Sequence, residues 1–156
     1  MGINIVEYTP EDVEAIKDLL VELQDTLKEI EPDIIAAGEK VRESYSKYIF
    51  DNAENRQGEI YLAKDGDKIV GFIAISIAKE SDEDVEYLYV SDMVVSKEYR
   101  GKGIGKQLLA KAEEYAKSKN LKYIRIGSLV SNPGATKLYK NFGFNDYLSF
   151  LQKKLD

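Results

Sequence analysis

Three alternating glycines, Gly101, Gly103 and Gly105, follow a run of β-forming residues and lead into a helical pattern of apolar residues. Glycine permits positive φ angles and leaves the neighbouring backbone amides uncovered. A turn of this kind at a helix N-terminus directs free N–H groups and the positive end of the helix dipole at one point. The stretch therefore predicts an anion site, above all for phosphate. Its other residues are Arg100, Lys102 and Lys106, which add positive charge, and Ile104, where the helical pattern begins.

Three glycine-rich phosphate motifs compete for this stretch. The dinucleotide fingerprint G-x-G-x-x-G does not fit, because the spacing from Gly101 to Gly105 is one residue too tight. The P-loop G-x-x-x-x-G-K-[ST] is one residue longer and needs a hydroxyl where Gln107 stands. The third pattern, [QR]-x-x-G-x-[GA], is matched by Arg100, Gly103 and Gly105. The alternative interpretation is a turn that only caps a helix.

A second block covers residues 132–144, N-P-G-A-T-K-L-Y-K-N-F-G-F. It places Asn132, Ala135 and Tyr139 at the spacing N-x-x-A-x-x-x-Y. Taken alone, a tyrosine in a short helix is usually a packing residue. Together, however, the two blocks resemble the GNAT superfamily of acyl-CoA-dependent N-acetyltransferases, in the same order along the chain.

The resemblance implies roles for residues of both blocks. The glycine turn would hold the pyrophosphate of acetyl-CoA, Asn132 would contact the pantetheine arm, and Tyr139 would protonate the leaving thiolate. Backbone N–H groups near the end of the preceding strand would polarise the thioester carbonyl. The cofactor-binding residues are thus expected to be Met93, Val94, Val95, Arg100, Gly101, Lys102, Gly103, Ile104, Gly105, Lys106, Asn132 and Ala135.

An amine acceptor must lose a proton before it attacks, and a carboxylate acting through water could accept that proton. Asp92 is the first candidate, because it immediately precedes the thioester-binding residues. Period-2 geometry predicts one shared face for Glu86, Leu88, Val90 and Asp92, with Glu86 the weaker candidate. Tyr89 stands where some family members carry a glutamate base. A structural role, as a cap or an ion pair, is the alternative for Asp92.

The composition narrows the chemistry. The 156 residues contain no cysteine and no histidine, so the usual thiolate nucleophile, imidazole base and zinc ligands are missing. The net charge of −6 disfavours non-specific nucleic-acid binding and favours a cationic substrate or partner. No apolar run is long enough for a membrane span, and the opening residues lack the pattern of a secretion signal. We therefore expect one cytoplasmic domain over residues 1–156, with no metal site.

Apolar periodicity predicts the element order β-α-α-β-β-β-α-β-α-β, a mixed α+β domain. Strands are expected at 3–8, 59–64, 68–78, 85–95, 121–129 and 147–155. Helices are expected between Thr9 and Pro32, and at 39–52, 103–117 and 135–141. The helical crossover makes 121–129 parallel to 85–95. With the resemblance, this predicts a three-layer α/β/α fold whose mostly antiparallel sheet contains one parallel, splayed strand pair.

The end of the chain departs from the family pattern. The family usually closes with two strands, whereas here there is room for little more than one, so the sixth strand would be vestigial. The final strand and the exposed helix faces leave room for a homodimer.

Three functions are compatible with these features. The leading interpretation is acetyl transfer from acetyl-CoA to the primary amine of a polyamine, amino sugar, amino acid or peptide. A non-catalytic acyl-CoA-binding sensor is the runner-up. A protein N-terminal acetyltransferase ranks third, because such an enzyme would usually have a longer closing loop than Asn145-Asp146.

Overall fold

The computed structural model describes residues 2–156; Met1, the first residue of the expected domain and of its opening stretch, lies outside the described residues. The strands are β1 (Asn4–Glu7), β2 (Glu59–Asp65), β3 (Lys68–Ala78), β4 (Tyr87–Val95) and β5 (Ile124–Ile126). The helices are α1 (Val13–Ile30), α2 (Gly38–Asn55), α3 (Ile104–Ser118) and α4 (Pro133–Phe142), with short 3-10 turns at Pro10–Asp12 and Lys97–Tyr99.

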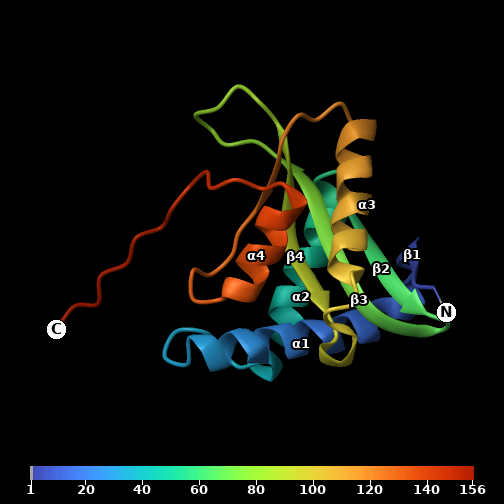
Figure 1. Cartoon of the computed structure of the whole chain (residues 1–156), viewed down its shortest axis with the longest axis horizontal. Helices are drawn as coiled ribbons and strands as arrows, with labels where there is room; N and C mark the ends of the chain where they lie inside the picture. The colour runs from blue at the N-terminus through green and yellow to red at the C-terminus, as the bar shows by residue number, and fades with distance from the viewer. Residues whose placement is uncertain (1) are drawn as a thin grey trace.

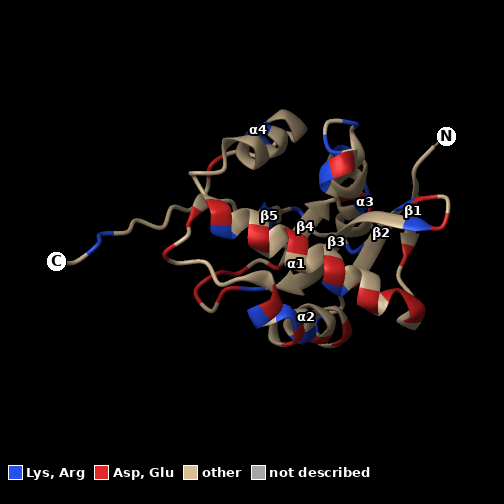
Figure 2. Ribbon diagram, turned by 90° about the horizontal axis from the view of Figure 1, so that it is seen from below, with Lys and Arg blue, Asp and Glu red and all other residues tan. Residues whose placement is uncertain are grey.

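The strands form one sheet in the order β1-β2-β3-β4-β5, between two helical layers. Figures 1 and 2 show α2 on one side of the sheet and α3 and α4 on the other. The first three strand pairs are antiparallel and the β4–β5 pair is parallel. The predicted α+β fold with its three layers is therefore confirmed.

Each face of the sheet carries its own apolar core. Residues of α1 and α2, among them Ile16 and Ile49, pack with Phe72 and Val94 on one face. On the other face, residues such as Leu108 of α3 form the second core with side chains of β2, β3 and β4. The long apolar run of β3 follows from this arrangement, because both of its faces are buried. Within residues 2–156, no helix is both long enough and apolar enough to cross a membrane.

A β-bulge interrupts β4 at Ser91. Ala74 of β3 pairs with Asp92, but the next residue, Ile75, pairs with Val90, so Ser91 is an extra residue. An extra residue reverses the alternation of faces. The predicted common face for Val90 and Asp92 is therefore wrong: Val90 lies in the α3-side core, whereas Asp92 lies on the α2 side.

The parallel strand pair is shorter than predicted. The strand expected at 121–129 is limited to Ile124–Ile126, and its pairing with β4 ends at Val90 opposite Ile126. Beyond that point β4 bulges and continues to Val95 without a partner on this side, so the second half of the expected strand has nothing to pair with. We call this opening, beyond Val90 and Ile126, the β4–β5 gap.

The strand expected at 147–155 is absent, and that prediction is wrong. Residues after α4 leave the body of the protein in an extended path and do not return to the sheet (Figure 1). Tyr147 donates a hydrogen bond to Glu83, and its ring stacks on the guanidinium of Arg125. Past this contact no strand runs beside the segment, so its backbone has no ladder to join.

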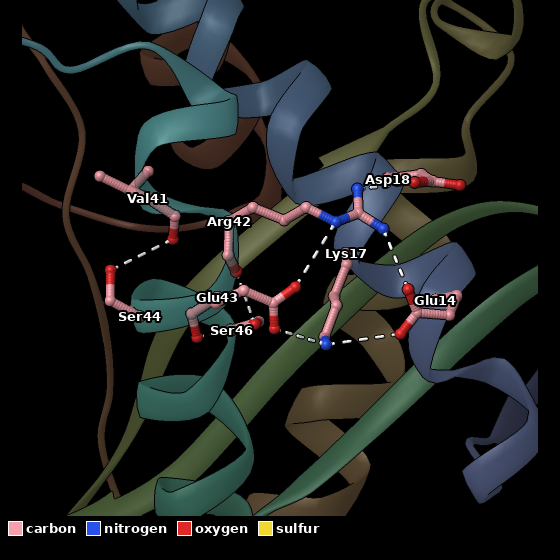
Figure 3. A network of polar contacts seen from close by, with 8 residues as sticks. All are labelled: Glu14, Lys17, Asp18, Val41, Arg42, Glu43, Ser44 and Ser46. Atoms are coloured by element: carbon pink, nitrogen blue, oxygen red, sulfur yellow. Dashed lines mark hydrogen bonds and ion pairs between the residues drawn. The ribbon is translucent and has the colours of Figure 1, made fainter.

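A charged cluster joins α1 to α2 (Figure 3). Arg42 bonds to Asp18 at 2.7 Å and to Glu14 at 3.3 Å, while Lys17 bridges Glu14 and Glu43. The side chain of Arg42 is only 18% exposed although its partners are more than 70% exposed. The cluster therefore fixes the rotation and height of α2 along α1.

We predict that Arg42→Ala lowers the midpoint of thermal unfolding, because it removes three ion-pair contacts between α1 and α2 or along α2. The measurement is thermal unfolding followed by circular dichroism. Lys47→Ala is the matched control, since Lys47 makes one exposed pair within α2. Equal midpoints for the two variants would contradict a positioning role for the cluster.

Candidate active site

The glycine turn has the geometry of an anion cradle. Gly101 and Gly103 adopt φ angles of 77° and 82°, which favour glycine. The first helical residue is Ile104, and no side chain caps the helix. In the part of the chain that the structure describes, the N–H groups of residues 101–106 have no hydrogen-bond partner. These six consecutive amides lie at the N-terminal, positive end of α3, where an anion would be bound favourably.

Gly105 has a different role from the other two glycines. It lies in the first turn of α3, is buried, and has no positive φ angle. A Cβ atom at this position would lie 3.0 Å from Leu138 Cδ2 and 3.5 Å from Met93 Cε. Its missing side chain therefore lets α3 approach α4 and β4 closely, which the alternation of glycines does not reveal.

Arg100 braces the turn from outside. Its Nε donates to the carbonyl of Val95 at 3.0 Å, and its guanidinium lies 4.0 Å from Glu22. Glu22 also accepts the N–H of Lys97 at 2.8 Å, so α1 is tied to the end of β4. Lys102 lies over the ring of Tyr99, and Lys106 is exposed beside the cradle.

The backbone of β4 is open along the β4–β5 gap. Ser96 donates its N–H to Val70 of β3, so strand alternation directs the backbone of Val94 toward β3 as well. The same alternation directs the N–H groups of Met93 and Val95 into the gap. Of the three residues that the sequence predicts for thioester binding, Met93 thus presents its N–H and carbonyl at this edge. Val95 presents its N–H, whereas its carbonyl accepts the hydrogen bond from Arg100.

Tyr139 lies on α4 and is mostly shielded from solvent by its packing. Its ring packs beside Phe144 and against the α3-side core, and no described residue bonds its hydroxyl. Burial, followed by the charge of Asp92, raises the pKa of Tyr139 to about 12, so the hydroxyl keeps its proton at neutral pH. Asn132 caps α4 by accepting the N–H of Ala135 at 3.5 Å, which positions the helix that carries Tyr139.

Asp92 lies on the α2 side of the sheet, beside Tyr45. It is 8% exposed and accepts a hydrogen bond from the hydroxyl of Tyr45 at 3.0 Å. Burial raises the pKa of Asp92 to about 7, although the bond from Tyr45 opposes the rise. The charge of Asp92 also raises the pKa of Tyr89, after burial and Tyr48. A carboxyl group that titrates near neutrality is suited to accept a proton.

The sequence analysis missed the roles of Tyr45 and Tyr48. They project from α2 with ring centroids 5.7 Å apart, and Tyr45 contacts Asp92 although 47 residues separate them. Their spacing on one helical face was visible, but it could not distinguish a core stripe from the wall of a site. The bulge at Ser91, which turns Asp92 toward them, leaves no signal in the sequence.

The family model described as "Acetyltransferase (GNAT) family" matches residues 20–144, which include the glycine turn, the open edge of β4, Asp92 and Tyr139. The chain belongs to the GNAT acetyltransferase family. The predicted family is therefore confirmed.

Two curated proteins and one solved structure illustrate what this GNAT protein is similar to. It is 31% identical over 160 residues to a protein of Bacillus subtilis subsp. natto named probable spermine N(1)-acetyltransferase, covering 99% of this chain and 97% of the relative. It is 36% identical over 80 residues to an uncharacterized N-acetyltransferase of Methanocaldococcus jannaschii, covering 51% of this chain but only 35% of that relative. A solved structure assigned as an acetyl transferase, from Pyrococcus furiosus, is 28% identical with a TM-score of 0.74, covering 99% and 100% of the two chains.

We predict that Asp92→Asn stabilises this GNAT domain at alkaline pH. The pKa of Asp92 is raised in the folded state, so its contribution to the free energy of unfolding is fully present below about pH 4. That contribution is lost as the pH rises through about 7. The free energy of unfolding of the variant should exceed that of the parent at pH 8 by up to about 4 kcal/mol, with the difference shrinking toward pH 4.

The measurement is urea denaturation of both proteins at pH 4, 6 and 8. Asp67→Asn, on an exposed turn, serves as the control substitution of the same kind. A constant difference between Asp92→Asn and the parent across this range would show that Asp92 does not titrate as described.

Proposed function

We propose that the protein transfers the acetyl group of acetyl-CoA to a primary amine of a small molecule, by direct attack without a covalent enzyme intermediate. The convergence that carries this proposal is at the β4–β5 gap. In this proposal the amide cradle of α3, the open edge of β4 and the hydroxyl of Tyr139 serve one bound cofactor at the gap, and the charge of Asp92 contributes to the raised pKa of Tyr139.

The described residues fit the three parts of acetyl-CoA. The uncovered amides of residues 101–106 suit its pyrophosphate. The edge groups of Met93 and Val95 suit the amides of the pantetheine arm, which can extend a sheet like a strand. One of these N–H groups would stabilise the oxyanion of the thioester carbonyl.

Transfer then needs three proton movements. Asp92 first takes one proton of the charged amine, through water, and the neutral nitrogen bonds to the carbonyl carbon as the carbon–sulfur bond breaks. The departing thiolate takes its proton from Tyr139, and the second amine proton, released as the amide forms, returns through water to Tyr139. An amine of pKa about 10.4 requires about 4.6 kcal/mol to be neutral at pH 7, and a base with a pKa of about 7 is partly in the carboxylate form that accepts its proton at that pH.

Polyamines are the acceptors that we place first. Tyr45 donates a hydrogen bond to the carboxyl group of Asp92, and its ring lies 5.7 Å from that of Tyr48. The ring faces and the charge together suit a cationic amine. The net charge of −6 favours approach of a polycation. The similarity to the protein named probable spermine N(1)-acetyltransferase, over nearly its full length, supports the same class.

A non-catalytic acyl-CoA sensor is the alternative from another class. It would need the amide cradle and the open edge, but it would not need a protonated phenol and a near-neutral carboxyl on the two sides of the gap. Tyr139 and Asp92 therefore favour an enzyme. A short chain between α4 and Tyr147 likewise favours a small acceptor over a peptide held by a closing loop.

We predict that the protein releases free thiol from acetyl-CoA with spermine or spermidine, and that Tyr139→Phe lowers kcat by about 10²-fold or more, because the thiolate loses its acid. The measurement is thiol release against a panel of polyamines, amino sugars, amino acids and short peptides. Tyr123→Phe, on an exposed ring, is the control. Tight acetyl-CoA binding with no turnover on any amine would overturn the enzyme in favour of the sensor.

We predict that kcat rises with pH to a plateau above about pH 7, as Asp92 loses its proton. Asp92→Asn should remove this plateau, and the remaining slower reaction should keep rising toward pH 10 as the amine itself deprotonates. The measurement is kcat for one polyamine between pH 5.5 and 9.5. A plateau that persists near pH 7 in Asp92→Asn would exclude Asp92 as the base.

A further inference from the structure

The helix that carries Tyr139 is attached to the body of the protein mainly along one side. None of the ten residues of α4 is buried, and the helix follows β5, a strand of only three residues. On the α3 side, Leu138 packs so closely that its Cδ2 would lie 3.0 Å from a Cβ atom on Gly105. A helix held along one side can tilt about that contact, so the position of the Tyr139 hydroxyl depends on a second anchor.

A hydrogen bond from the opposite helical layer supplies this anchor. The hydroxyl of Ser131 donates to Oε1 of Glu31 at 2.8 Å, although 100 residues separate them. Ser131 lies in the loop that runs from Ile126, where the β4–β5 gap begins, to α4, and Glu31 directly follows α1. Figures 1 and 2 both show the end of α1 close to this loop. Because α1 packs on the α2 side and α4 on the α3 side, the bond joins the two layers beside the gap. We call this bond the Glu31–Ser131 brace.

The end of the brace on α1 is a fixed point. The N–H of Glu31 donates to the carbonyl of Leu27 at 2.9 Å, which continues the bonding of α1 by one residue. Lys28 donates to the carbonyls of Pro32 and Ile35, at 3.1 Å each, and so holds the turn after the helix from within. Glu31 therefore presents its carboxylate from a turn that is already ordered by its own hydrogen bonds.

The other end of the brace is joined firmly to α4. The hydroxyl of Ser128 lies 3.1 Å from that of Thr136, which also donates to the carbonyl of Asn132 at 3.3 Å. These bonds tie the loop around Ser131 to the first turn of the helix. Tyr139 follows Asn132 by seven residues, about two helical turns along the same rigid element. A displacement of Ser131 is therefore carried to Tyr139.

We propose that Glu31 and Ser131 are positioning residues for acetyl transfer, because their brace ties α4 to α1 and so sets the reach of the Tyr139 hydroxyl toward the leaving sulfur. This inference rests on the proposed function, in which Tyr139 is the acid. A misplacement of about 1 Å can cost about 10²-fold in rate. The pyrophosphate would be held by the separate amide cradle of residues 101–106. Loss of the brace should therefore lower kcat and leave the affinity for CoA unchanged.

The first test is a double-mutant cycle on kcat with spermine, with the Kd for CoA measured by calorimetry. Ser131→Ala and Glu31→Ala should each lower kcat by about 10-fold at an unchanged Kd, and the double variant should lose no more, because all three lack the same bond. Glu31→Gln keeps an oxygen that accepts the bond and should restore most of the rate. Glu29→Ala, at an exposed position of α1, is the control. Losses that add in the double variant, or that appear in Kd instead of kcat, would overturn the brace.

The second test does not depend on turnover. Hydrogen exchange of residues 133–142, followed by mass spectrometry, should be faster in Ser131→Ala and Glu31→Ala by about 3- to 10-fold, with no further gain in the double variant. Exchange in α3 should be unchanged. Unchanged exchange in α4 would overturn the brace even when the parent acetylates amines. A parent without turnover on any amine refutes the proposed function instead, and exchange in α4 then still decides whether the brace anchors this helix.

Discussion

The extra residue at Ser91 is the constraint on which the site depends. Without it, the side chains of β4 would continue to alternate between the two faces of the sheet. Asp92 would then face α3 rather than the tyrosines of α2. The same bulge coincides with the last pair between β4 and β5, so the strands separate just where β4 has changed its twist. One local irregularity thus opens the edge at Met93 and Val95 and supplies a carboxyl group on the opposite side. The two halves of the proposed reaction are divided between the two faces of one sheet.

Asp92 shows the cost of this arrangement. Its burial disfavours the charged carboxylate, and the hydrogen bonds from Tyr45 and Ser91 compensate only in part. A buried asparagine would satisfy Tyr45 without the charge, so the fold alone does not require an acid at this position. The stability of the domain and the chemistry of the gap therefore make opposite demands on the same side chain. The surrounding elements are held in place by the bond between Arg42 and Asp18 of α1. The hydrogen bond from the N–H of Lys97, after β4, to Glu22 of α1 has the same effect.

The sequence was most informative where local pattern and local structure coincide. The glycine turn, the helices and the long strands follow from residue types and periodicity, and the two motif blocks identified the family. The predictions that failed concern features that depend on neighbours distant in sequence. The strand at 121–129 was cut short because β4 bulges away from it, and the strand at 147–155 has no partner within the chain. The contact between Tyr45 and Asp92 depends on the bulge and on the placement of α2, neither of which periodicity reports.

The chemical make-up of the site has a consequence for where such a protein can work. The groups that border the gap are backbone amides, a phenol and a carboxyl group, with no thiol and no imidazole anywhere in the sequence. Among residues 2–156, the one sulfur atom belongs to Met93, whose methyl group lies against the first turn of α3. Peroxide, alkylating agents and thiophilic metal ions would find few of their usual targets here. A site of this composition is expected to keep its chemistry under oxidative conditions that silence cysteine-dependent transferases.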